Sequence, residues 1–321
     1  MQNVPLVAIK CLVFNHEPYL RDCLNGFVMQ QTDFPFVAIV HDDASTDHSA
    51  DIIREYAAKY PDIIRPIYET ENQYSKSDGS LGRIMNAAVD ATGAKYIALC
   101  EGDDYWTDPH KLQKQVSFLE THQEYSLCCH RYRIYNQNEQ TWEDDYVADY
   151  FAGGKNPDGF AFTKHINLFD CWITKTNTLL YRRGLFDWNI LARYHYSRDV
   201  HNVYHLLSCG MGYCLPFVGA VYRRQDSGIF SSLTKEQQYR QSFLIYAELF
   251  QNNLQDEDLV TFFENFSRNY FDNLRVRIQQ RQWNVLLLKD MVDFMRNAPQ
   301  SFTTTFIIRK FLHSMWYSVT T

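Results

Sequence analysis

Four features that would assign the chain to common protein classes are missing from its sequence. None of the eight cysteines forms a Cys-x-x-Cys pair, so neither a zinc site nor a disulfide framework is indicated. No run of 18 or more apolar residues is present, which argues against a membrane-spanning helix. A glycine-rich phosphate loop and internal repeats are absent as well.

An excess of basic residues is also missing. The chain has 31 Lys and Arg against 38 Asp and Glu, a net charge of −7, so we expect no nucleic-acid partner. Residues 1–10 lack the basic region and apolar stretch of a secretory signal. Cysteines such as Cys100 stand in apolar runs, as buried reduced thiols do. We therefore expect a protein that is located in the cytoplasm or bound peripherally at the inner face of the membrane.

Short apolar runs alternate with amphipathic segments over the first two-thirds of the chain. Leu6–Phe14, Phe36–Val40 and Tyr96–Cys100 are typical of buried strands, and helical patterns follow them. Such alternation predicts an α/β fold with a mostly parallel central sheet flanked by helices. The polar residues 136–165 are predicted to form a loop over the site. From Lys235 onward the pattern is helical, so we predict an α/β domain at 1–232 and a helical region at 233–321.

Polar and acidic residues follow three of the predicted strands: Asn15–Glu17, Asp42-Asp43 and Asp103-Asp104. Ligands of open α/β sheets bind at the carboxyl ends of the strands, where these clusters should meet. Adjacent aspartates repel each other unless a cation neutralises them, and hard divalent cations prefer carboxylate and phosphate oxygen. Asp103-Asp104 therefore suits a metal–diphosphate site, although a helix-capping turn would also explain it. Asp42-Asp43 suits a base or ribose contact, with a helix cap as the alternative.

Three ordered motifs carry a resemblance to a known family. They are Asn15-His16-Glu17-Pro18-Tyr19-Leu20, His41-Asp42-Asp43-Ala44-Ser45-Thr46-Asp47 and Cys100-Glu101-Gly102-Asp103-Asp104-Tyr105-Trp106-Thr107-Asp108-Pro109. Together they resemble the family 2 glycosyltransferases of bacterial surface-polysaccharide synthesis, over roughly residues 4–230. The resemblance implies the nucleotide-sugar-binding GT-A fold, with a nucleotide half at about 1–125 and an acceptor half at about 126–232.

The resemblance also implies residue roles. Asp43 would hold the base of the donor, beside the backbone near Leu12 and Phe14. The other donor contacts would be Asn15, Glu17, Asp42 and Asp103. Asp103 and Asp104 would bind Mg²⁺ or Mn²⁺, with Glu101 standing where the family has its first Asp.

Further along the chain, Asp199 in the run Ser197-Arg198-Asp199-Val200 resembles the family's catalytic base. The later run Ala220-Val221-Tyr222-Arg223 resembles a strand end of the family. Gln225 occupies the place of a frequent His, two residues after that Arg.

The expected activity is inverting transfer of a sugar from a nucleoside-diphosphate donor, with a UDP-sugar favoured, to a saccharide or lipid-linked saccharide. A catalytically silent sugar-nucleotide-binding protein and a sugar nucleotidyltransferase remain as alternatives. The C-terminal segment Phe302–Tyr317 is apolar with basic residues between. It suits either peripheral contact with a membrane surface or a packed terminal helix or homodimer contact.

Overall fold

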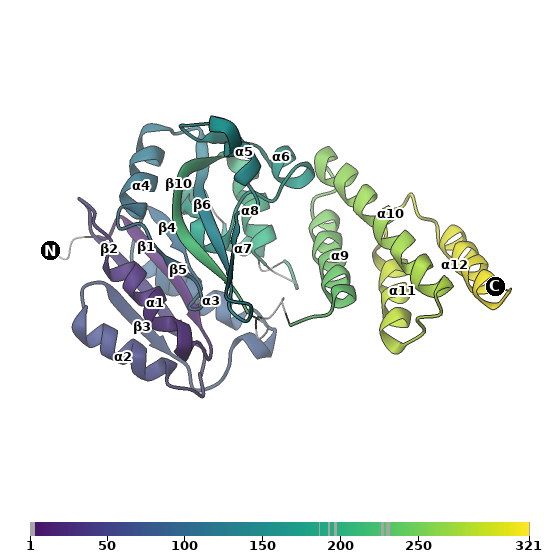
Figure 1. Cartoon of the computed structure of the whole chain (residues 1–321), viewed down its shortest axis with the longest axis horizontal. Helices are drawn as coiled ribbons and strands as arrows, with labels where there is room; N and C mark the ends of the chain where they lie inside the picture. The colour runs from purple at the N-terminus through teal and green to yellow at the C-terminus, as the bar shows by residue number, and fades with distance from the viewer. Residues whose placement is uncertain are drawn as a thin grey trace. The chain divides into compact units, whose positions relative to one another are not determined.

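The computed structural model describes residues 4–185, 187–191, 193–195, 198–225, 228 and 232–320. The chain forms two compact units. The first comprises residues 1–195 and 199–226, and the second comprises 196–198 and 227–321. Figure 1 traces the chain through both.

The first half of the N-terminal unit is a parallel sheet. Its strands lie in the order β3-β2-β1-β4, and every neighbouring pair is parallel. The elements in chain order are β1 (Val7–Val13), α1 (Glu17–Val28), β2 (Phe36–Asp42), α2 (Ser49–Lys59), β3 (Ile64–Tyr68), α3 (Ser80–Ala91) and β4 (Tyr96–Leu99). This confirms the strand–helix alternation that the apolar runs predicted.

The second half of the unit extends the same sheet in the order β4-β9-β6-β10-β5. β6 and β10 are parallel, but β9 and β5 run antiparallel to their neighbours, so the sheet as a whole is mixed. The elements are β5 (Tyr105–Trp106), α4 (Lys111–Thr121), β6 (Tyr125–Asn136), β7 (Thr141–Asp144), α5 (Ala148–Phe151), β8 (Phe160–Phe162), α6 (Lys164–Phe169), β9 (Leu180–Arg182), α7 (Trp188–Leu191), α8 (Asp199–Cys209) and β10 (Met211–Arg224).

The expected loop over residues 136–165 is wrong in part. The segment contains β7, which pairs with β6, and β8, which pairs with β10. All four β7 residues are exposed and polar or aromatic, so the strand leaves no apolar signal in the sequence. Its pairing is set by the hairpin with β6 instead.

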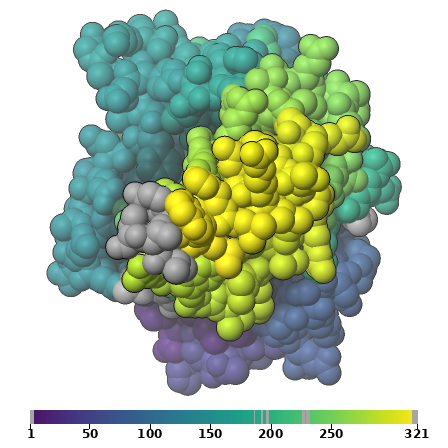
Figure 2. Space-filling model, turned by 90° about the vertical axis from the view of Figure 1, so that its right-hand side faces the viewer, coloured from purple at the N-terminus to yellow at the C-terminus, as the bar shows by residue number. Residues whose placement is uncertain are grey.

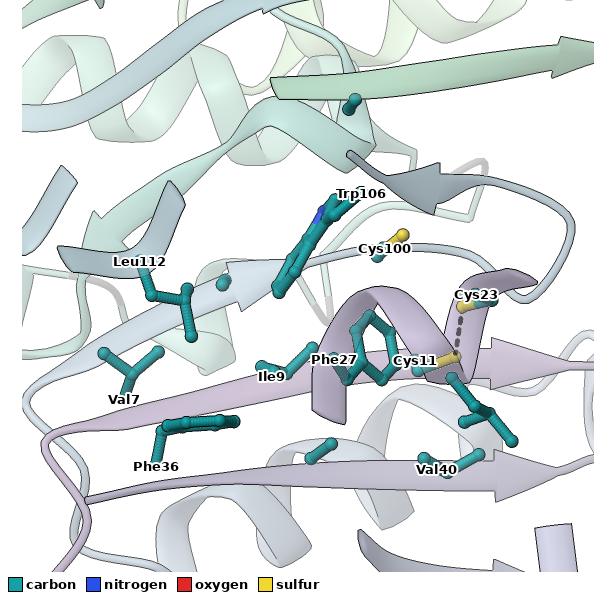
Figure 3. Close-up of a cluster of buried hydrophobic side chains, with 14 of the residues drawn as sticks. Val7, Ile9, Cys11, Cys23, Phe27, Phe36, Val40, Cys100, Trp106 and Leu112 are labelled. Carbon is teal, nitrogen blue, oxygen red and sulfur yellow. Dashed lines mark hydrogen bonds between the residues drawn. The ribbon is translucent and has the colours of Figure 1, made fainter. Parts of the chain in front are cut away.

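Both faces of the sheet are buried. Val7, Ile9 and Cys11 of β1 pack into one apolar cluster with Phe27 of α1 (Figure 3), whereas Ala8 faces a second cluster on the other side. This alternation explains why the strands are apolar along their whole length. The packed core therefore fixes the strand ends, and with them the positions of the polar residues that follow.

The C-terminal unit is helical, as predicted. α9 (Lys235–Gln251), α10 (Glu257–Gln279), α11 (Val285–Asn297) and α12 (Thr304–Thr320) surround a core rich in phenylalanine. Side chains of Thr234, Asp256 and Asn284 cap the first three helices. None of the helices in the described residues is both long and apolar enough to cross a bilayer. The domain boundary at 232/233 stays a prediction.

Candidate functional site

Two of the predicted clusters are tied to neighbouring carbonyls at the end of β1. The Asp43 N–H donates to the Val13 carbonyl at 2.9 Å, and the Gly102 N–H donates to the Leu12 carbonyl at 3.0 Å. A Cβ at Gly102 would lie 2.7 Å from His16 Nδ1, so only glycine allows this approach. The segments after β2 and β4 thus flank the end of β1.

Asp43 orders the chain that follows β3. The backbone N–H groups of Gln73 and Tyr74 donate to its two carboxylate oxygens at 2.7 and 3.0 Å. The side chain is buried, at 3% exposed. Its neighbour Asp42 is equally buried, but its Oδ1 has no hydrogen-bond partner in the described part of the chain. Of the two aspartates, Asp42 is therefore the one with a carboxylate oxygen available to accept a hydrogen bond from a ligand.

Asn15 and Glu17 hold two loops together. Asn15 adopts a φ of 55° and its Oδ1 accepts from the Thr46 N–H at 2.8 Å. Glu17 Oε2 accepts from the His48 N–H at 3.1 Å. Phe14 exposes 44% of its surface beside them, while Leu12 packs against the second core cluster. The loops after β1 and β2 thus form one rim.

Asp103 and Asp104 have different environments. Asp104 is buried, and its Oδ1 accepts from the Arg223 N–H at 2.8 Å. Burial, together with the charge of Asp103, raises the pKa of Asp104 well above its usual range. Asp103 is only half-buried, and its Oδ2 accepts from Gln225 Nε2 at 2.9 Å. Asp103 is thus the more accessible of the two carboxylates.

Glu101 lies among charged groups from distant parts of the chain. Burial, followed by the charge of Asp103, raises its pKa to about 8, and Lys10 opposes that shift. Asp199, the exposed first residue of α8, adds to the upward shift. Both Asp103 and Asp199 are therefore close enough to Glu101 to affect its ionisation. Ser197, in the motif that precedes Asp199, lies outside the described residues.

Comparison with known proteins identifies the family. The profile of "Glycosyl transferase family 2" matches residues 11–187, more than half of the chain. The chain belongs to this family. The resemblance seen in the ordered motifs is thereby confirmed.

Two sequence relatives of the chain cover different shares of it. An uncharacterized protein of Mycobacterium tuberculosis (Rv1520) is 35% identical over 245 residues, 70% of this chain and 61% of the relative. The chain thus spans about three fifths of that relative's length. A putative teichuronic acid biosynthesis glycosyltransferase of Bacillus subtilis, TuaG, is 31% identical over 115 residues, 36% of this chain and 42% of the relative.

Two solved structures share the fold. S. aureus TarS 1–349 with UDP-GlcNAc has a TM-score of 0.64 at 16% identity, covering 96% of this chain and 89% of TarS. The Pyrobaculum calidifontis mannosyltransferase PcManGT, with GDP-Man and Mn²⁺, has a TM-score of 0.51 at 12% identity, covering 99% and 87%. The chain therefore has the GT-A fold expected for family 2.

The carboxylates of this family 2 chain fit a cation that takes most of its ligands from a substrate. No group of three or more His, Cys, Asp or Glu side chains in the described ranges could enclose a metal by itself. Mg²⁺ is usually bound through one or two carboxylates together with substrate phosphates. Asp103, with one oxygen bonded to Gln225, meets that requirement.

Two residues of the site were not among the predicted site residues. Arg223 donates from Nε to the Asp103 carbonyl at 3.0 Å and pairs with Asp22 at 2.9 Å. His16 has a buried Nδ1 without a partner in the described residues; burial lowers the pKa of His16, and the charge of Asp103 partly opposes that shift. The sequence places His16 within a motif and Arg223 at a strand end. Neither motif reveals the hydrogen bond from Arg223 to Asp103 or the charge of Asp103 near His16, because both come from tertiary folding.

Proposed function

We propose that this family 2 glycosyltransferase transfers a sugar, with inversion, from a nucleoside-diphosphate donor to an acceptor hydroxyl. The observation that carries the proposal is that the acidic segment after β4 is hydrogen-bonded to the ends of β1 and β10, through Gly102 and Asp104. The charge of Asp199, 96 positions from Asp103, also reaches Glu101 in this segment and helps to raise its pKa, after burial and the charge of Asp103. Direct displacement requires a cation that neutralises the diphosphate leaving group, and Asp103 would hold that cation. It also requires a base that accepts the proton of the attacking hydroxyl, and the exposed carboxylate of Asp199 would be that base.

In the proposed mechanism, Asp199 takes the proton from the acceptor hydroxyl as that oxygen attacks the anomeric carbon. Its carboxylate is exposed, and it already accepts the N–H of Val200 at 2.9 Å, which orients it at the start of α8. A single base with no protein nucleophile gives one displacement and hence inversion. A bound Mg²⁺ or Mn²⁺, held through Asp103 with Asp104 behind it, would stabilise the charge that develops on the diphosphate. The complex of PcManGT with GDP-Man and Mn²⁺ supports this choice of ion.

The donor nucleotide is assigned to the rim formed by the loops after β1 and β2. Asp42 offers its unused Oδ1, and Phe14 offers an exposed ring that could stack on a base. Asp43 contributes through the segment 72–74, which its carboxylate orders. Leu12, Asn15 and Glu17 complete the rim. UDP is the favoured nucleotide, which the complex of TarS with UDP-GlcNAc supports.

The acceptor is proposed to be a saccharide or a lipid-linked saccharide in surface-polysaccharide assembly. The name of TuaG, which concerns teichuronic acid biosynthesis, supports this class. The cytoplasmic location and a homodimer stay predictions.

Release of nucleoside diphosphate from a panel of UDP- and GDP-sugars, with and without Mn²⁺, tests the proposal. We expect release with at least one donor and little without the ion. Asp103→Asn should abolish release, because the ion loses its carboxylate. Asp199→Asn should keep donor binding but lose transfer by roughly a hundredfold or more. Asp33→Asn, an exposed change near the start of β2, is the matched control.

The outcomes separate the alternatives. A protein that binds donors but releases no diphosphate under any condition is a silent binding protein. Formation of a sugar nucleotide from a sugar phosphate and a nucleoside triphosphate would identify a nucleotidyltransferase. Full transfer by Asp199→Asn would refute the base assignment.

A further inference from the structure

Helix α12 buries one apolar face and exposes large apolar side chains on another. Ile307 and Phe311 are buried in the core of the C-terminal unit against α10. On the other face Ile308 is 45%, Leu312 59% and Trp316 63% exposed. Figure 2 shows α12, in yellow, at the surface of this unit. Large apolar side chains that stay this exposed are not needed for packing the helix core.

A basic groove lies beside the start of α12. It has a volume of about 320 Å³ and is lined by Arg268, Arg275, Lys310, Phe302, Phe306 and Asp272, among others. Asp272 forms an ion pair with Arg275 at 3.2 Å. The other two basic residues of the groove are Arg268 and Lys310. Neither Arg268 nor Lys310 forms an ion pair with a carboxylate of the described chain, and Lys310 Nζ stands 5.7 Å from the Phe306 ring centre. The basic groove is therefore lined by both positively charged side chains and the aromatic rings of Phe302 and Phe306.

The local charge is opposite to that of the whole protein. α12 carries Arg309 and Lys310 and has no Asp or Glu, whereas the chain has a net charge of −7. Exposed apolar residues with basic neighbours on one helix are the pattern of helices that lie in the surface of an anionic bilayer. Tryptophan at such a surface sits at the level of the head groups.

We propose that α12 and the basic groove form a docking surface for an anionic phospholipid bilayer. Arg268 and Lys310 would bind phosphate head groups, and Ile308, Leu312 and Trp316 would enter the acyl boundary. A second copy of the chain is a poorer occupant, because a symmetric contact that covers α12 would bury Arg309 and Lys310 of both copies, and α12 has no Asp or Glu to pair with them. This inference is independent of the proposed catalytic activity.

Co-sedimentation of the full chain with vesicles tests the proposal. We expect binding to phosphatidylcholine vesicles that contain phosphatidylglycerol, weaker binding to phosphatidylcholine alone, and loss at high salt. Because each basic residue near the surface contributes about 1 kcal/mol, Lys310→Gln should weaken binding about fivefold and Arg268→Gln with Lys310→Gln roughly thirtyfold. Leu312→Ser with Trp316→Ser should weaken binding even to the charged vesicles. Soluble glycerol phosphate should compete poorly, since it supplies no acyl region.

Matched controls use exposed residues of the same unit away from this surface. Lys289→Gln on α11 removes one charge, and Leu254→Ser removes an exposed apolar side chain, 60% exposed. Both should bind vesicles like the unchanged protein. Circular dichroism of every variant verifies that the helices still form.

Three results would overturn the proposal: equal binding to charged and neutral vesicles, no vesicle binding at all, or a dimer by light scattering that Leu312→Ser with Trp316→Ser splits. Because the assay measures no transfer, its failure leaves the catalytic proposal untouched.

Discussion

Lys111 is a lysine with no exposed surface, and its contacts explain how the core accommodates it. Its Nζ lies 2.7 Å from Gln115 Oε1 and 3.9 Å from the ring centre of Trp106. Burial lowers its pKa to about 7, and Cys100, Cys128 and Asp108 only partly oppose that shift. The lysine is thus tolerated because it can lose its charge and because the ring and the amide contact its ammonium group.

Lys111 should make the stability of the fold depend on pH. The unfolded chain holds this proton up to about pH 10.5, whereas the folded chain releases it near pH 7. The unfolded state therefore binds more protons above pH 7, and the free energy of unfolding should rise with pH by up to about 1.4 kcal/mol per unit. Lys111→Met should remove this contribution.

Urea unfolding between about pH 7 and about pH 8.5 measures the pH slope of the unfolding free energy in the original protein and in Lys111→Met. The upper limit is the ordinary pKa of cysteine, so that ionisation of cysteines in the unfolded chain stays small. Lys10, whose burial lowers its pKa to about 8, adds a slope of the same sign to both proteins and cancels in the comparison. Lys59→Met, an exposed change on α2, should keep the original slope. A Lys111→Met protein with an unchanged slope would show that the buried lysine stays charged.

The two aspartates after β4 show what a single sequence leaves out at the scale of residues. The motif predicted that Asp103 and Asp104 act together, but it could not rank them. The rank comes from Arg223, whose N–H fixes Asp104, and from Gln225, which bonds Asp103. Both partners lie about 120 positions away, beyond the reach of local pattern.

At the scale of elements, the end of β10 holds the carboxylate segment in place. Arg223 is nearly buried, and its guanidinium contacts three acceptors: the Asp103 carbonyl, Gln137 Oε1 at 2.7 Å and Asp22. The rings of Tyr19 and Tyr105 lie within 5.2 Å of its Cζ. β10 thereby links α1, the β4–β5 connection and the end of β6.

Replacing Arg223 should disturb both stability and activity. Lysine cannot reproduce the forked set of donors, so Arg223→Lys should cost about 2–3 kcal/mol of unfolding free energy. Misplacement of Asp103 should also lower diphosphate release more than tenfold, since small shifts of a positioned group are costly. Thermal melting and the release assay measure the two effects.

The neighbouring arginine provides the control. Arg224 points to Glu143 on β7, with Nη1 3.0 Å from Oε1, and its side chain is 36% exposed. Arg224→Lys should change stability by less than about 1 kcal/mol and leave release intact. Equal losses in both variants would mean that β10 is merely sensitive to substitution and that Arg223 has no special role.

Strands differ in how far the sequence predicts them. β1, β2 and β4 are buried on both faces, so their apolar runs identify them directly. β5, β8 and β9 have two or three residues each, and no periodicity is measurable over such a length. They exist because longer strands lie beside them, and their antiparallel pairing makes the sheet mixed where a mainly parallel one was expected.

At the scale of the whole molecule, the family and fold followed from the order of motifs, while the C-terminal unit did not. Motifs fix the N-terminal unit because ligand chemistry requires certain residues after certain strands. The helices of residues 235–320 follow from periodicity, but their packing rests on aromatic contacts such as Phe243 with Tyr270, 4.6 Å between ring centres. Periodicity alone predicts where helices form, but it does not predict which helices pack against each other.

Each unit has its own apolar core, so the chain should unfold in two steps. One core is built around the sheet and the other around Phe243, Phe263 and Phe294. Within the second, Asp290 is buried between Arg277 at 2.7 Å and Arg240 at 3.2 Å, an arrangement that requires only this unit. Differential scanning calorimetry of the full chain should therefore resolve two transitions.

The donor should separate these transitions. A ligand that binds only the folded N-terminal unit stabilises it by about 2.7 kcal/mol at 100 times its dissociation constant. UDP-sugar with Mn²⁺ should therefore raise one transition and leave the other unchanged. Arg277→Met should act the other way: it leaves the buried Asp290 with Arg240 as its remaining arginine partner and lowers the second transition, by less than the about 3–5 kcal/mol that a fully broken buried pair costs. A single transition that moves as a whole in both experiments would mean that the two cores unfold as one cooperative unit, and the predicted boundary at 232/233 would then have no thermodynamic meaning.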